Sequence, residues 1–136
     1  TLATTKVYEL NDDIYPSLKR YKQEGMITRP QGTIFEQIAE LIYLNGTECT
    51  SCFEMAKNLT KEITEKAVVP QYSFNITMTD TSLEEHTLYN YTHVDNFGAN
   101  HTIDNSDLVF SSKKVIIVPI NKTEIVSYVA EVMVWQ

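Results

Sequence analysis

The spacing of apolar residues changes once along this chain, near residue 70, from a helical period to a strand period. Before that point apolar side chains recur every three or four residues, as in the group Ile34, Phe35, Ile38, Leu41 and Ile42. Beyond it, residues 72–79 alternate apolar and polar side chains. The first pattern is typical of an amphipathic helix and the second of a half-buried strand. Helices followed by strands predict an α+β fold with an antiparallel sheet.

Three helices are predicted in the first half of the chain. The first begins at the cap-forming residues 11–13 and stops at Gly25. The second covers residues 33–44. The third begins at Ser51, where Ser-Cys-Phe-Glu matches a capping box, in which two side chains bond each other's backbone N–H groups. Together these elements form a helical half of about residues 11–67.

Four strands are predicted in the second half. They cover residues 72–79, 87–92, 108–118 and 125–135. The last two are joined by a short polar turn, as in a hairpin, and residues 95–107 form a long loop. We therefore expect one globular domain, residues 1–136, in which N-terminal helices pack on a C-terminal antiparallel sheet of about four strands. The strand half spans about residues 71–135.

Charge and hydropathy argue against binding to nucleic acid and against a membrane-spanning segment within this chain. The formal net charge of -7 disfavours binding to the phosphates of nucleic acid. No apolar run approaches the roughly 20 residues that cross a bilayer. The chain begins with Thr1 and not with Met, so we expect a processed or truncated form in which any targeting or anchoring segment would lie upstream, and any membrane contact would be made through that segment.

Six of the nine asparagines stand in Asn-x-Thr triplets, each of which can accept an N-glycan. They are Asn45, Asn58, Asn75, Asn90, Asn100 and Asn121. Ser and Thr make up roughly a sixth of the residues, so chance predicts only one or two such triplets. The excess predicts an exported glycoprotein that resides outside the cell or on its surface.

Most of these asparagines fall on predicted solvent positions, at a helix end, on the polar side of an element or in a loop. The five that do so are Asn45, Asn58, Asn75, Asn100 and Asn121. Asn90 is ambiguous, because Leu88 shares its face of the strand. The placement agrees with glycans that extend into solvent.

Cys49 and Cys52 form a Cys-x-x-Cys motif where the third helix is predicted to begin. In an oxidising compartment the pair would form a local disulfide. A helix N-terminus also stabilises a thiolate, which is the chemistry of thiol–disulfide oxidoreductases. Free thiols or a bound metal are the remaining readings. The disulfide is favoured, because Glu48 stands where thioredoxin-like motifs carry Trp and no buried strand precedes the motif.

No other group of residues predicts a catalytic, metal or cofactor site. The spacing of His86, His93 and His101 matches no zinc or haem pattern, and these side chains are expected in solvated loops. The glutamates Glu36 and Glu40 are expected on a solvated helix face. Among the aromatic residues, Tyr89 and Tyr91 are the surface candidates for a carbohydrate or ligand site, and Tyr72, Tyr128 and Trp135 are expected to pack the sheet.

The chain resembles the soluble domains of archaeal pilin-like surface proteins, which are exported with class III (type IV pilin) signal peptides. The likeness rests on helices followed by an antiparallel sheet, on the Ser-Ser-Lys-Lys string at residues 111–114, and on the closing strand Val-Ala-Glu-Val-Met-Val-Trp at residues 129–135. Dense Asn-x-Thr triplets also suit an archaeal cell surface. One departure is that the apolar N-terminal helix of pilins is absent from this chain.

The resemblance implies a non-enzymatic surface, adhesion or filament-associated domain that self-associates into a surface assembly. Residues 1–10 would then continue an upstream helix or add an edge strand to a neighbouring subunit. Three alternatives remain: a thiol–disulfide oxidoreductase that uses Cys49 and Cys52, a secreted carbohydrate- or ligand-binding module, and a viral or eukaryotic ectodomain with the same triplets.

Overall fold

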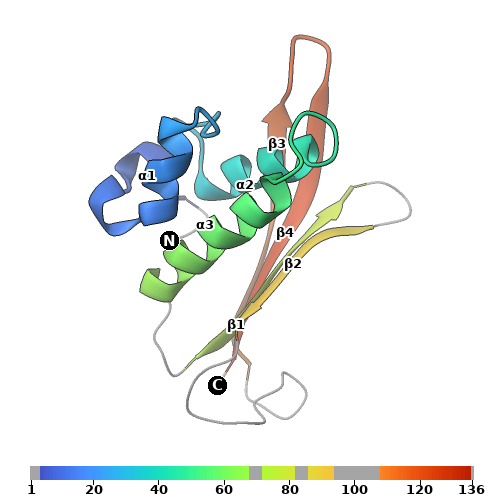
Figure 1. Ribbon diagram of the computed structural model, residues 1–136. Coiled ribbons are helices and arrows are strands. Elements are labelled where there is room, and N and C mark those ends of the chain that lie inside the picture. The colour runs from blue at the N-terminus through green and yellow to red at the C-terminus, as the bar shows by residue number, and fades with distance from the viewer. Residues whose placement is uncertain (1–3, 68–71, 82–85, 94–107, 136) are drawn as a thin grey trace. The chain divides into compact units, whose positions relative to one another are not determined.

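The structure, a computed structural model, describes residues 4–67, 72–81, 86–93 and 108–135 (Figure 1). It divides into two compact units, Thr1–Ala67 and Val68–Gln136. Among the described residues, the first unit holds the α-helices and the second holds a four-stranded antiparallel sheet. The predicted α+β class and the order of helices before strands are therefore confirmed. The single globular domain stays a prediction.

The first α-helix, α1 (Pro16–Gln23), begins later than the sequence predicted. The side chain of Asn11 caps a separate 3-10 turn, Asp12–Ile14, by accepting a hydrogen bond from the Asp13 N–H at 3.0 Å. Pro16 occupies the first turn of α1, where its missing N–H costs nothing. Ile14, the last residue of the 3-10 turn, is 49% exposed.

The N-terminus of α1 is capped by a side chain from a distant part of the chain. Both carboxylate oxygens of Glu62, on α3 (Cys52–Ala67), accept a hydrogen bond from the Ser17 N–H, at 3.0 and 3.1 Å. A negative charge at this position also complements the helix dipole. At the other end, Gly25 adopts a φ of 73°, which fits the predicted glycine stop.

The capping box lies on α2 (Ile34–Leu44) and not on the third helix. The Glu36 N–H donates to the hydroxyl of Thr33 at 3.2 Å, and the Thr33 N–H donates to the Glu36 carboxylate at 3.1 Å. The Ser51 hydroxyl lies 4.0 Å from the sulfur atoms of Cys49 and Met55, so the predicted capping box at Ser51 was wrong. Glu36, which was expected on a solvated face, instead closes the start of its helix.

The segment before α2 is tied to that helix by polar side chains. Gln37 is 2% exposed. It accepts a hydrogen bond from the Arg29 N–H at 2.6 Å and donates one to the Thr28 hydroxyl at 3.1 Å. The Arg29 guanidinium forms an ion pair with Glu40, whose side chain is 13% exposed. Glu40 was predicted to be solvated, and the ion pair accounts for the difference.

The N-terminal segment is bound inside the helical unit. Residues Val7–Glu9 form one 3-10 turn, and Val7 is 2% exposed. The Val7 N–H donates to the Gly32 carbonyl at 3.0 Å, and Lys6 forms a β-bridge with Thr33. The described part of residues 1–10 therefore neither continues an α-helix nor extends as a separate strand.

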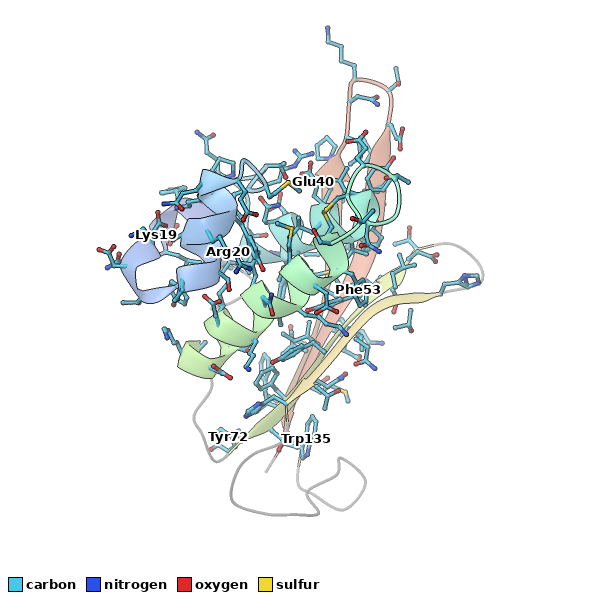
Figure 2. The ribbon with its side chains drawn as sticks, in the orientation of Figure 1. Lys19, Arg20, Glu40, Phe53, Tyr72 and Trp135 are labelled. Atoms are coloured by element: carbon cyan, nitrogen blue, oxygen red, sulfur yellow. A yellow bond between two sulfur atoms is a disulfide. The ribbon has the colours of Figure 1, made fainter. Side chains whose placement is uncertain are left out.

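The sheet has the order β2-β1-β4-β3, with antiparallel pairing between neighbours. Its strands are β1 (Ser73–Asp80), β2 (Thr87–His93), β3 (Leu108–Pro119) and β4 (Ile125–Trp135). The predicted strand limits agree with these to within one residue. Ser73 pairs with Trp135, so that Tyr72 and Trp135 lie at the same end of the sheet (Figure 2).

Alternation gives the sheet one apolar and one mostly polar face. The buried apolar residues are Phe74, Ile76, Met78, Tyr89, Ile116, Val118, Tyr128 and Ala130. Tyr89 pairs with Met78 and is 1% exposed, so its predicted surface role was wrong. Tyr91 is half-buried, and its ring stacks on that of Phe74 with centroids 5.9 Å apart. Tyr128 and Trp135 are buried, as expected.

Candidate functional site

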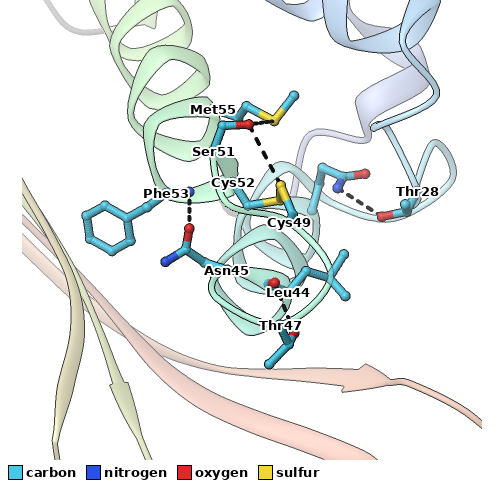
Figure 3. The surroundings of a disulfide bond; sticks show 10 residues. Thr28, Leu44, Asn45, Thr47, Cys49, Ser51, Cys52, Phe53 and Met55 are labelled. Atoms are coloured by element: carbon cyan, nitrogen blue, oxygen red, sulfur yellow. Dashed lines mark hydrogen bonds between the residues drawn. A yellow bond between two sulfur atoms is a disulfide. The ribbon is translucent and has the colours of Figure 1, made fainter.

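The two cysteines form a disulfide that joins the loop after α2 to the start of α3 (Figure 3). Their Cα atoms lie 5.6 Å apart. Cys52 is the first residue of α3 and is 0% exposed, whereas Cys49 is half-exposed in the loop. While the bond is intact, neither sulfur can act as a thiolate nucleophile or bind a metal.

Asn45 caps α3 from the C-terminal end of α2. Its Oδ1 atom accepts a hydrogen bond from the Phe53 N–H at 3.0 Å (Figure 3). Ser51, predicted for this role, places its hydroxyl 4.0 Å from the sulfur atoms of Met55 and Cys49. The disulfide and the Asn45 cap therefore act together to hold the connection between the two helices.

The triplet at Asn121 forms the exposed turn between β3 and β4. The Asn121 Oδ1 atom accepts hydrogen bonds from the Thr123 N–H at 2.9 Å and from the Thr123 hydroxyl at 3.0 Å. The first of these is an Asx-turn, which mimics a backbone turn. Asn121, Lys122 and Thr123 are all exposed. This side chain is thus held by its oxygen, with its amide nitrogen bonded to no other described residue.

Two triplets face each other across β1 and β2. In the strand register Asn75 pairs with Thr92 and Thr77 pairs with Asn90. The Asn75 Nδ2 atom lies 2.6 Å from Asn90 Oδ1, 2.8 Å from the Thr92 hydroxyl and 3.3 Å from the Tyr91 carbonyl. Asn90, ambiguous in sequence, is exposed, and Asn75 is half-buried.

The triplet at Asn58 is less open than its sequence predicted. Its Nδ2 atom donates to the hydroxyl of Tyr21 at 3.0 Å, and Tyr21 is 2% exposed. Thr60 is 1% exposed and donates its hydroxyl to the Ala56 carbonyl at 2.8 Å. The helical spacing of α3 did not reveal this burial, because α1 packs beside α3.

A polar hollow of about 360 Å³ lies in the sheet unit and was not predicted. It is lined by Thr77, Thr79, Asp80, Thr81, Lys113, Val129 and Glu131. Lys113 and Glu131 form an ion pair of 3.5 Å across β3 and β4. Among the described residues, the lining offers hydroxyl, carboxylate and ammonium groups. Strand register brings these residues together, and register is not visible in the spacing of one sequence.

The remaining predicted candidates do not converge on a site. The described residues contain no group of three or more His, Cys, Asp or Glu side chains that could hold a metal ion. His93, predicted to be solvated, ends β2 with its ring stacked on Phe74 at 5.2 Å. Asn100 and His101 lie outside the described residues. None of the helices in the described ranges is both long and apolar enough to cross a membrane.

No protein-family model, curated protein or solved structure matches the chain.

Proposed function

We propose that this chain is an extracellular, N-glycosylated domain of an archaeal pilin-like surface protein, and that it works by contact with other proteins and not by catalysis. One observation carries the proposal. The Asn121 triplet occupies an exposed hairpin turn in which the asparagine Oδ1 atom accepts hydrogen bonds. The Nδ2 atom, to which a glycan would be attached, is not bonded to any described residue. A glycan attached there would extend into solvent.

The disulfide supports an oxidising location. Disulfides persist in secreted and surface proteins and are rare in reducing cytosol. Cys52 is 0% exposed, which suits a structural bond.

The edge strand β3 supports self-association. In the described sheet it has one neighbour, β4, and it exposes Phe110, Val115 and Ile117 by 53%, 57% and 55%. An apolar edge strand is a template for pairing with another chain. We propose that the partner is a second copy of this protein, as in a surface filament.

The polar hollow favours a second candidate function, that of a ligand-binding module. Its mixture of hydroxyl, carboxylate and ammonium groups would bind a small polar ligand such as a sugar. A glycan array tests this candidate, and the Lys113→Ala variant is the control. Binding that survives Lys113→Ala would place the ligand elsewhere.

Secretion into a glycosylating host tests the main proposal. We expect enzymatic deglycosylation to lower the mass of the secreted protein. Asn121→Gln should reduce the mass lost on deglycosylation by that of one glycan. Asn11→Gln, which alters an asparagine outside any triplet, should leave the mass lost on deglycosylation unchanged. A secreted protein without sugar would contradict the proposal.

Self-association is tested by sedimentation velocity at high protein concentration. We expect assemblies of the wild type that dissociate in the Val115→Lys/Ile117→Lys variant, because two lysines prevent apolar contact at β3. Glu65→Lys, on an exposed helical position, is the matched control. A wild type that stays monomeric would remove the assembly from the proposal.

A further inference from the structure

We propose that the folded protein carries glycans at Asn45, Asn90 and Asn121 and not at Asn58 or Asn75. This inference rests on the proposed function and deepens it. In N-glycosylation the asparagine Nδ2 atom bonds to the anomeric carbon of a lipid-phosphate-linked sugar. The bond from that carbon to the phosphate oxygen breaks, the lipid phosphate leaves, and Nδ2 loses one proton. The triplets therefore differ in whether the asparagine side chain is held in the fold by a hydrogen bond to Oδ1, which the reaction leaves unchanged, or by one from Nδ2, which the reaction modifies.

Three asparagines are held through Oδ1, which glycosylation leaves in place. Asn45 accepts from the Phe53 N–H at 3.0 Å, Asn90 accepts from Asn75 at 2.6 Å, and Asn121 accepts from Thr123. Among the described residues, none receives a hydrogen bond from the Nδ2 atom of these three. A sugar can be attached at each without loss of the bond that positions the side chain.

Asn75 is held through the nitrogen itself. Its Nδ2 atom has three acceptors, namely Asn90 Oδ1, the Thr92 hydroxyl and the Tyr91 carbonyl. The carbonyl can only accept, so the amide group that faces it must be the nitrogen. A sugar on Nδ2 would replace one of its two hydrogens and occupy the space of a neighbour within 2.8 Å.

Glycosylation of Asn58 is excluded by the hydrogen bond of its Nδ2 atom and by the burial of Thr60. Nδ2 donates to the buried Tyr21 hydroxyl at 3.0 Å. The triplet requirement means that the transferase contacts the threonine, and Thr60 is only 1% exposed. By contrast, the threonines of the Asn45, Asn90 and Asn121 triplets, namely Thr47, Thr92 and Thr123, are all exposed.

The order of glycosylation and folding does not change the outcome. If the chain folds first, the nitrogens of Asn58 and Asn75 are already bonded. If a sugar is added first, chains modified at these positions lose the α1–α3 contact of Tyr21 or the β1–β2 side-chain bonds. Both routes deplete the same two sites in folded protein.

Site mapping tests the inference on the secreted wild-type protein. Enzymatic deglycosylation in heavy-oxygen water converts each glycosylated Asn to a labelled Asp, which peptide mass spectrometry locates. We expect label at Asn45, Asn90 and Asn121, and at least about fivefold more at Asn121 than at Asn75, the change that one hydrogen bond of ordinary net strength gives to an equilibrium.

A variant that releases Asn75 separates the hydrogen-bond argument from local sequence preference. Asn90→Ala/Thr92→Ala removes two of the three acceptors and should raise the label at Asn75. Thr123→Ala, which abolishes only the triplet at Asn121, should leave Asn75 unlabelled. Equal label at Asn75 and Asn121 in the wild type would overturn the inference and leave the proposed function standing. A protein without label at any triplet would overturn both.

Discussion

The helical and sheet units solve the same problem, how to satisfy polar groups, in different ways. In the helical unit, side chains bond the open ends of helices, as Glu62 does for Ser17 and Asn45 does for Phe53. In the sheet, backbone pairing satisfies the strands, and side chains such as Asn75 and Asn90 bond one another across the ladder. The helical unit therefore depends on a few single residues, whereas the sheet depends on register.

The largest effects are expected in the two cores. Leu41 in α2 and Ile76 in β1 are both 1% exposed, so Leu41→Ala and Ile76→Ala form a matched pair. Each should lower the free energy of unfolding by about 2–5 kcal/mol, because it leaves a cavity. Chemical denaturation with circular dichroism measures the loss.

The same pair tests whether the two units form one domain. A unit of about 70 residues is marginal alone, so we expect both variants to reduce amide-exchange protection in both units. Protection that falls only in the mutated unit would show that the units unfold independently.

The disulfide should have a smaller effect. Cys49→Ala/Cys52→Ala is expected to lower the free energy of unfolding by about 2 kcal/mol, since the bond closes a very short loop and restricts the unfolded chain little. The wild type should show no insulin-reducing activity above that of Cys49→Ser. Activity that depends on Cys49 would support the oxidoreductase alternative.

Removal of a distant cap should cost less again. Glu62→Ala is expected to lower stability by about 1 kcal/mol, the usual cost of a lost N-cap. Glu65, on an exposed position of the same helix, gives the control Glu65→Ala, which should change stability little. Equal losses in the two variants would show that Glu62 acts through helix propensity and not through Ser17.

The smallest effect is expected at the ion pair of the polar hollow. The Lys113 side chain is 70% exposed, so solvent screens its attraction to Glu131. Lys113→Met should change stability by less than about 1 kcal/mol. A larger loss of stability, measured by thermal unfolding, would show that the sheet also depends on single side chains and not mainly on strand register.

The sequence predicted elements better than it predicted partners. Apolar spacing located the α2 and β4 residues closely, because periodicity reflects burial within one element. It assigned Asn11 to the start of the first helix, where Glu62 acts from 45 residues away. Such caps depend on how elements pack, and no local pattern encodes that.

The same limit applies to the candidate site. The Asn-x-Thr triplets were visible at once, but their hydrogen bonds were not. From α3 alone, Asn58 is predicted to face solvent. In the structure its side chain donates a hydrogen bond to the hydroxyl of Tyr21 on α1. Asn75 and Asn90 lie 15 positions apart, and only the register of β1 and β2 shows that their side chains meet.

The most direct measurement is the mass of the peptide that contains Asn121, taken from secreted protein before and after deglycosylation. The proposed function predicts a sugar-bearing peptide in most molecules, because this triplet is exposed and its side chain is held only through Oδ1 among the described residues. An unmodified peptide, recovered from a host that glycosylates other secreted proteins, would contradict the central claim.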